Sequence, residues 1–343
     1  MNAHAKPTLG NPAFDGAVAF GPQVLDLDCE AEAEAIAQGL RVQLRGMRKR
    51  GLVLGLSGGI DSSVSAMLAV RAVGAKNVFA LFMPENDSDP ESLRLGRLVA
   101  DQLGIESVVE DIGPALEAMG CYSRRDGFIR TVVPEYGTGW ASKLAIANAL
   151  EGPGYNLTQL VVEDPQGQQS RHRLPLSAYL GIVAATSMKQ RTRKQLEYFH
   201  ADRLNFAVLG TPNRLEYDQG FFVKNGDGAA DVKPLAHLYK TQVYALAAHL
   251  GVPAEIQARP PTTDTFSLAQ SQDEFYFSLP WNRMDLCLYG LNHGVDAAQV
   301  GAAAGLSAEE VERVWADIAS KRKATHHLHQ PPLLVRAVTE IEG

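Results

Sequence analysis

The stretch VLGLSGGIDSSVSAMLAV, residues 53–70, joins a short apolar run to a helix-like pattern through Ser-Gly-Gly. The apolar run predicts a buried strand over 52–56, and the pattern that follows predicts a helix over 61–73. A strand that leads through a glycine-rich turn into a helix is typical of an anion site, because backbone N–H groups and the helix dipole point there. Gly58 and Gly59 would let oxygen atoms approach the backbone without a Cβ in the way.

Asp61 is unusual in such a turn, because a carboxylate repels bare phosphates. It fits if a divalent cation lies between Asp61 and the phosphates, since Mg²⁺ sites typically use one or two carboxylates. The alternative is purely structural: the glycines shape a tight turn and Asp61 is a charge at a helix N-terminus. Ser-Gly-Gly-x-Asp-Ser after a first strand favours the phosphate site over that alternative. Neither G-x-x-x-x-G-K-[ST] nor G-x-G-x-x-G occurs there, which argues against an ordinary P-loop or Rossmann turn.

The composition limits the class of protein. The chain has 343 residues, 45% hydrophobic and 21% charged, which is typical of a soluble globular protein. Its net charge of −7 argues against a nucleic-acid partner, which would favour a basic surface. The three cysteines (Cys29, Cys121 and Cys287) lie far apart, as expected in a reducing compartment. We find no signal peptide and no apolar run long enough to span a membrane, so we expect a cytoplasmic protein.

Short apolar runs alternate with helical patterns along the chain. This alternation predicts an α/β fold with a doubly wound parallel sheet, right-handed crossovers and flanking helices. The expected strands are 52–56, 78–83, 107–112 and 206–209, and the expected helices are 28–50, 61–73, 90–103, 177–204 and 238–250.

We expect one domain over residues 1–343. Within it, residues 1–27 form an irregular lead-in and residues 252–330 form a helical C-terminal part. Residues 121–176 are rich in Gly and Pro, and two alternating runs there flank Asp-Pro-Gln-Gly. That pattern predicts an insertion that contains a β-hairpin.

A second segment, VLGTPNRLEYDQGFFVKNGDGAADVKPLAHLYKTQV over residues 208–243, follows the last predicted strand. Sites in open parallel sheets lie at the carboxyl ends of strands. We therefore expect this segment to lie at the same sheet edge as the glycine turn. Taken singly, its charged residues are ordinary; Asp231 and Lys240, for example, could form a surface ion pair of small energy.

Together the two segments resemble a known family. Residues 57–62 resemble the pyrophosphate loop of the N-type ATP pyrophosphatases, and residues 208–243 resemble the signature region of ammonia-dependent NAD synthetases. This resemblance runs from about residue 30 to residue 325 and implies an adenine nucleotide alpha hydrolase-like, Rossmann-like fold.

The resemblance implies a role for each matching residue. ATP would contact Gly55, Leu56, Ser57, Gly58, Gly59, Ile60, Asp61, Ser62, Thr211, Lys240 and Thr262. Deamido-NAD would contact Arg191, Lys224, Asp231 and Lys321, and Mg²⁺ would be held by Asp61 and Glu216. No covalent nucleophile is implied. Ser187, Pro212 and Ser320 depart from the family pattern, so ATP chemistry is more firmly implied than the identity of the acid.

The implied reaction has two steps. The nicotinate carboxylate of deamido-NAD attacks the α-phosphorus of ATP and releases pyrophosphate; ammonia then attacks the adenylate and AMP leaves. Glutamine-dependent relatives carry a glutaminase domain, and the roughly fifty residues before the glycine turn are too few for one. We expect free ammonia and a homodimer, with a separate glutaminase partner left open. The alternatives are a ligase that amidates a different carboxylic acid and a non-catalytic adenine-nucleotide-binding module.

Overall fold

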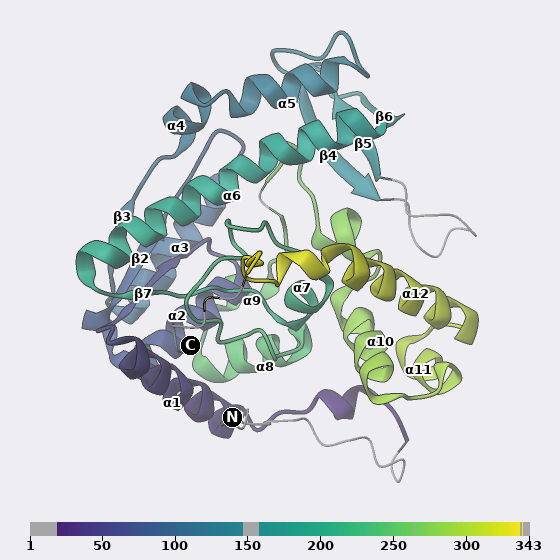
Figure 1. The fold of residues 1–343 in the computed structure, drawn as a ribbon. Coiled ribbons are helices and arrows are strands. Elements are labelled where there is room, and N and C mark those ends of the chain that lie inside the picture. Colours follow the sequence, from purple (N-terminus) through teal and green to yellow (C-terminus); the bar gives the residue numbers. More distant parts are fainter. Residues whose placement is uncertain (1–18, 147–157, 264, 337, 339–343) are drawn as a thin grey trace.

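A parallel sheet of four strands forms the centre of the protein (Figure 1). The structure, a computed structural model, describes residues 19–146, 158–263, 265–336 and 338. The strand order is β3-β2-β1-β7, in which Leu52 of β1 pairs with Val78 on one side and with Ala207 on the other. The strands are β1 (Leu52–Gly55), β2 (Val78–Phe82), β3 (Glu106–Val109) and β7 (Ala207–Val208).

Helices cover both faces of this sheet, which confirms the doubly wound arrangement. Leu52 and Leu54 of β1 pack into the core beneath one group of helices, whereas Val53 faces α6 on the other side. This alternation follows from the period of two in a strand. The first group consists of α1 (Cys29–Met47), α2 (Ile60–Val73), α3 (Pro90–Leu103) and α8 (Lys240–Leu250), and the opposite helix is α6 (Leu176–Leu204).

Local signals place the helix ends close to their predicted positions. The Asp28 carboxylate accepts a hydrogen bond from the Ala31 N–H at the start of α1. Gly251, with φ of 75°, ends α8 in the left-handed conformation. The predicted lead-in lies largely in residues 1–18, outside the described residues; of the rest, Pro22–Leu25 form a 3₁₀ turn.

The segment between β3 and α6 contains more structure than the predicted hairpin. Two helices, α4 (Gly113–Ala118) and α5 (Cys121–Arg130), precede a three-stranded antiparallel sheet in the order β4-β5-β6. The hairpin is confirmed as β5 (Thr158–Glu163) and β6 (Gln169–Arg173). The first strand, β4 (Ala141–Ile146), was not predicted from the sequence. We call β4, β5 and β6 the inserted sheet.

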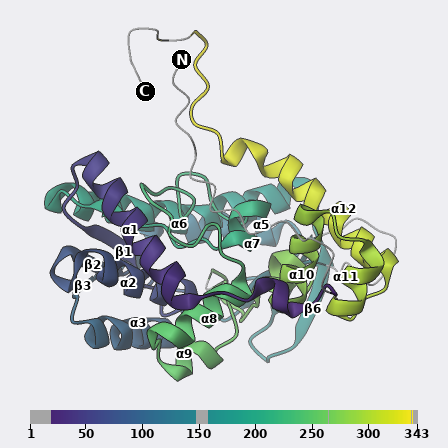
Figure 2. The ribbon, with the colours of Figure 1, turned by 90° about the horizontal axis from the view of Figure 1, so that it is seen from below.

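The C-terminal part is helical with one interruption. Helices α9 (Ala254–Ala258), α10 (Trp281–His293), α11 (Ala297–Ala304) and α12 (Ala308–Thr325) are present. Between α9 and α10, residues 259–263 and 265–271 are irregular apart from an isolated bridge between Thr262 and Ser271, and a π-helical turn follows at Asp273–Phe277. Figures 1 and 2 place α10, α11 and α12 at the end of the molecule opposite β3.

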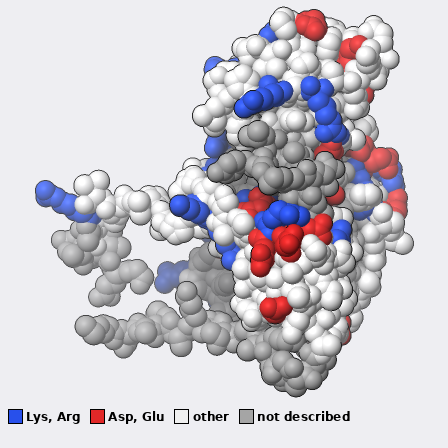
Figure 3. All heavy atoms as spheres, turned by 90° about the vertical axis from the view of Figure 1, so that its right-hand side faces the viewer, with Lys and Arg blue, Asp and Glu red and all other residues white. Residues whose placement is uncertain are grey.

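The surface carries charges of both signs. On the face shown in Figure 3, acidic and basic side chains lie next to each other near the centre of the view. Within the described ranges, no helix combines the length and the apolar character that crossing a membrane requires.

Candidate functional site

A cavity of about 1070 Å³ lies at the carboxyl edge of the parallel sheet. Its volume is of the size that small-molecule sites have in proteins. The walls come from the ends of β1, β2 and β7, from α6, and from the irregular segment after α9. Every residue predicted to contact ATP lines this cavity: Gly55, Leu56, Ser57, Gly58, Gly59, Ile60, Asp61, Ser62, Thr211, Lys240 and Thr262.

The glycine turn is built as an anion site. Gly58 has φ of 73°, and a Cβ there would lie 2.5 Å from the Ser92 carbonyl oxygen, so only glycine fits. Gly59 is the N-cap of α2, and its carbonyl accepts hydrogen bonds from the hydroxyls of Ser62 (3.0 Å) and Ser63 (2.8 Å). The turn is therefore fixed by its own side chains, with the N-terminal end of α2 at the cavity.

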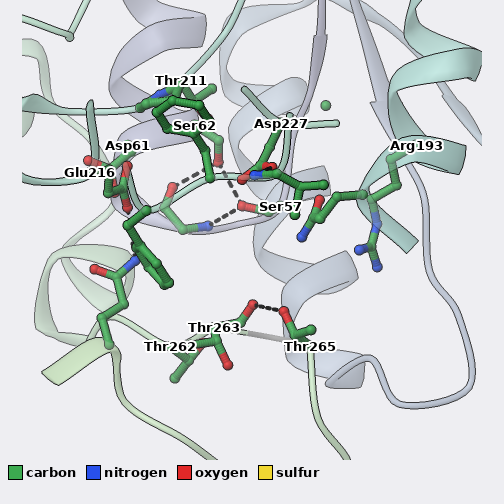
Figure 4. Close-up of a pocket in the computed structure, with 18 of the residues that line it drawn as sticks. Ser57, Asp61, Ser62, Arg193, Thr211, Glu216, Asp227, Thr262, Thr263 and Thr265 are labelled. Atoms are coloured by element: carbon green, nitrogen blue, oxygen red, sulfur yellow. Dashed lines mark hydrogen bonds between the residues drawn. The ribbon is translucent and has the colours of Figure 1, made fainter. Parts of the chain in front are cut away.

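Asp61 and Glu216 lie side by side, as Figure 4 shows. Asn213, almost completely buried, links them: its side-chain N–H donates to Asp61 Oδ1 (3.0 Å) and its backbone N–H donates to Glu216 Oε2 (3.1 Å). Asn213 is also the N-cap of α7 (Arg214–Gln219), with Glu216 at the third helical position. Sequence reasoning did not single out Asn213, although Asn-x-x-Glu is a capping-box pattern.

Lys240 completes a charge cluster with the two carboxylates. Its ammonium forms an ion pair with Asp61 Oδ2, and its side chain is 1% exposed. Burial opposes the charge on Lys240, but Asp61 and Glu216 outweigh that effect and hold its pKa above the ordinary value. Asp285 of α10, fully buried, accepts from the backbone N–H groups of Lys240 and Thr241 and so fixes the start of α8.

The two carboxylates fit a magnesium ion. Mg²⁺ is commonly held by one or two carboxylates together with substrate phosphates. Asp61 and Glu216 supply two, beside a turn suited to phosphates. Nowhere in the described part of the chain do three or more His, Cys, Asp or Glu side chains gather as a metal site. A magnesium ion here would therefore depend on oxygen ligands from the nucleotide.

Glu216 should make stability depend on pH. Burial and the nearby Asp61 raise the pKa of Glu216 to about 8. The folded chain keeps this proton after the unfolded chain has lost it, so the contribution of Glu216 to stability falls as pH rises from about 5 to about 8, by up to about 1.4 kcal/mol per pH unit. We expect the melting temperature of metal-free Glu216→Gln, measured by calorimetry, to fall less over this range than that of the parent chain. A steeper fall in the variant would contradict this assignment.

Three of the residues predicted to contact the acid also line the cavity. The Arg191 guanidinium donates to the Lys224 carbonyl (3.2 Å), and the Lys224 ammonium donates to the His327 carbonyl (2.8 Å). Lys321 lies against Asp317 (2.6 Å). Burial lowers the pKa of Lys321, although Asp317 opposes this effect. These cations form a second charged region in the same cavity.

Asp231 is not brought to this wall and does not line the cavity. One oxygen of its carboxylate accepts from the Val208 backbone N–H (2.7 Å), and the other accepts from the Tyr198 hydroxyl (3.5 Å). Asp231 thus anchors the loop that follows α7 to the end of β7.

Sequence reasoning missed an acidic group inside the cavity. Glu197, Asp227 and Lys194 all line it, and Lys194 donates to Glu197 (2.6 Å). Burial raises the pKa of both Glu197 and Asp227. One signal was available. Lys194 and Glu197 lie seven and four residues before the core residue Ala201, which places them on the buried face of α6, where charged side chains are unusual.

A glycine turn at a helix N-terminus and two neighbouring carboxylates, placed at the carboxyl edge of a parallel sheet, are typical of a nucleotide-binding α/β enzyme. The family model described as NAD synthase matches residues 32–130 and 164–331. The chain therefore belongs to the NAD synthase family, and it is a ligase.

Individual relatives agree with this assignment. The chain is 74% identical over 323 residues, 94% of its length and 97% of the relative, to the NH(3)-dependent NAD(+) synthetase of Rhizobium meliloti. It is 64% identical to that of Rhizobium rhizogenes over 93% of this chain and 97% of the relative. Among solved structures, the NH3-dependent NAD synthetase from Campylobacter jejuni matches with a TM-score of 0.59 and 21% identity, covering 90% of this chain and 100% of that one.

Proposed function

We propose that this chain converts deamido-NAD to NAD, using ATP and ammonia and passing through an adenylated carboxylate. The observation that carries the proposal is the placement of the glycine turn, Asp61, Glu216 and Lys240 on one wall of a cavity whose other walls hold Arg191, Lys224 and Lys321. Family membership supports the same reaction, since the two relatives described above are named as NH(3)-dependent NAD(+) synthetases.

The chemistry explains why these residues are needed. A carboxylate is a poor acyl donor until it is adenylated, and adenylation brings two anions together. The protein must therefore position the reactants and neutralise charge. Asp61 and Glu216 would hold Mg²⁺, which when bound neutralises charge on the phosphates of ATP. The N-terminal end of α2 and the Lys240 ammonium would stabilise the departing pyrophosphate, and no protein nucleophile is required.

The cations of the second region would hold the acid. Arg191, Lys224 and Lys321 carry positive charge at the cavity, where they would meet the phosphates or the carboxylate of deamido-NAD. The predicted contact between Asp231 and deamido-NAD has no support from the lining of this cavity, which does not include Asp231. A homodimer, which the family resemblance of residues 57–62 and 208–243 implies, belongs to the same proposal. So does a cytoplasmic location, which suits a chain with three widely spaced cysteines.

A product assay tests the proposed reaction. Purified protein with ATP, Mg²⁺ and deamido-NAD should form equal amounts of AMP and NAD with ammonium, and little NAD with glutamine. Chromatography of the nucleotides measures both products. Turnover with glutamine alone would contradict ammonia as the direct donor. Pyrophosphate exchange with another carboxylic acid but not with deamido-NAD would favour the different-acid ligase, and no exchange with any acid would favour a non-catalytic module.

A further inference from the structure

The inserted sheet contacts the segment that forms one wall of the cavity. We propose that β4 positions this wall, residues 259–263 and 265–274, and that Gln270 is the positioning residue between them. We call these residues the cavity-wall segment. The activity part of this inference rests on the proposed function, because the segment carries Thr262 at the ATP side of the cavity.

The inserted sheet lies partly outside what the family shares. The family model leaves out residues 131–163, which include all of β4 and all of β5. Because β4 is the edge strand in the order β4-β5-β6, its free edge can bond to another segment. The cavity-wall segment occupies that edge: the Ser142 N–H donates to Ser267 Oγ (2.9 Å), and the Leu268 N–H donates to the Ser142 carbonyl (3.2 Å).

Gln270 connects β4 to Thr263, a residue that lines the cavity. It is 4% exposed, and its amide N–H donates to the Leu144 carbonyl of β4. Its amide oxygen accepts from the Thr263 hydroxyl (3.3 Å), and its backbone carbonyl accepts from the Thr263 N–H (3.2 Å). Thr263 lines the cavity beside Thr262 and is also bonded to Thr265, as Figure 4 shows.

A parallel connection reaches the carboxylate pair. Lys143 of β4 donates to the Ala269 carbonyl (3.1 Å) and pairs with Glu274 (2.8 Å). Between those two contacts, the Gln272 amide donates to Glu216 Oε1 (3.0 Å). The same stretch of chain that is tied to β4 on both sides therefore holds one oxygen of Glu216.

The physical reason lies in the lack of regular structure over most of this segment, residues 259–263 and 265–271. A long connection without helix or strand loses much conformational entropy when it is ordered. If contacts with β4 already order the cavity-wall segment, nucleotide binding does not bear the entropy cost of ordering it. The affinity of the protein for ATP is then higher. The inserted sheet would thus act on ATP binding without touching ATP.

The test compares Gln270→Met and Lys143→Met with Arg171→Met, which changes an exposed cation on β6 of the same sheet. Hydrogen exchange of the ligand-free protein is measured over residues 265–274, together with KM for ATP and kcat. We expect Gln270→Met to speed exchange in this segment and to raise KM for ATP by about tenfold, the factor that corresponds to losing one buried hydrogen bond. Lys143→Met should also speed exchange over residues 265–274 and raise KM for ATP, but by less. Arg171→Met should leave both the exchange rate and KM for ATP unchanged.

Unchanged exchange over residues 265–274 in Lys143→Met and in folded Gln270→Met would overturn the inference. If Gln270→Met does not fold, Lys143→Met against Arg171→Met decides. Faster exchange without any rise in KM for ATP would overturn the link to ATP. The exchange measurement needs no substrate, so a failure of the proposed reaction is seen separately, as a parent chain that makes no NAD.

Discussion

Asp61→Asn is expected to lower the rate of NAD formation by about a thousandfold, the loss typical when a group that stabilises transition-state charge is removed. Asp61 is bonded to Asn213 and paired with Lys240, and it lies beside Glu216. Asparagine preserves the size of the side chain but removes the charge that a magnesium ion requires. NAD and AMP formation with ammonium, under saturating deamido-NAD, measures the effect.

The control for this variant is Asp101→Asn, an exposed carboxylate at the end of α3, which should keep parental activity. Circular dichroism should report a folded chain for both variants. Titration with Mn²⁺ in the presence of a non-hydrolysable ATP analogue gives a second readout, and Asp61→Asn should bind the ion more weakly. A folded Asp61→Asn with parental turnover would contradict the metal-ligand role.

Lys240→Met should show the second large effect, on both activity and stability. Loss of the ammonium removes a contact to the leaving pyrophosphate, and we expect turnover to fall about a hundredfold. Methionine also leaves the partly buried Asp61 carboxylate without its cation, and breaking a buried ion pair typically costs about 3 kcal/mol or more. Chemical denaturation and the NAD assay measure the two effects separately.

A double variant distinguishes these two consequences. Asp61→Asn with Lys240→Met removes both charges, so we expect it to recover part of the stability lost in Lys240→Met but none of the activity. Lys76→Met, an exposed lysine outside the cavity, is the matched control and should resemble the parent chain. A double variant less stable than Lys240→Met would show that the two side chains do not stabilise each other.

The parts of the fold that sequence predicts well are those with local signals. The strand β1, the glycine turn and α2 follow one another directly, so period, glycine content and helix pattern agree over residues 52–73. The same holds for α3, whose predicted and observed ends coincide at Pro90–Leu103. Each of these elements is specified by residues within itself.

The parts that sequence missed depend on distant partners. The strand β4 mixes Ser142 and Lys143 with apolar residues, and its free edge bonds to residues more than a hundred positions away in the sequence. The burial of Glu197 could not be predicted for a related reason. A carboxylate on a polar helix is usually exposed, and Glu197 is buried only because α6 packs against the sheet. Asn213 joins two carboxylates that come from separate strand ends.

The position of β1 in the sheet has a consequence for the order in which the protein is made and folds. Its partner β2 follows soon along the chain, whereas β7, its partner on the other side, comes much later. Pairing with β7 must close a long loop, which slows folding. During synthesis the glycine turn can form early, but Glu216 reaches Asp61 only after β7 has emerged and paired. A ribosome-bound chain that ends before α7 would contain the glycine turn and Asp61 but not Glu216.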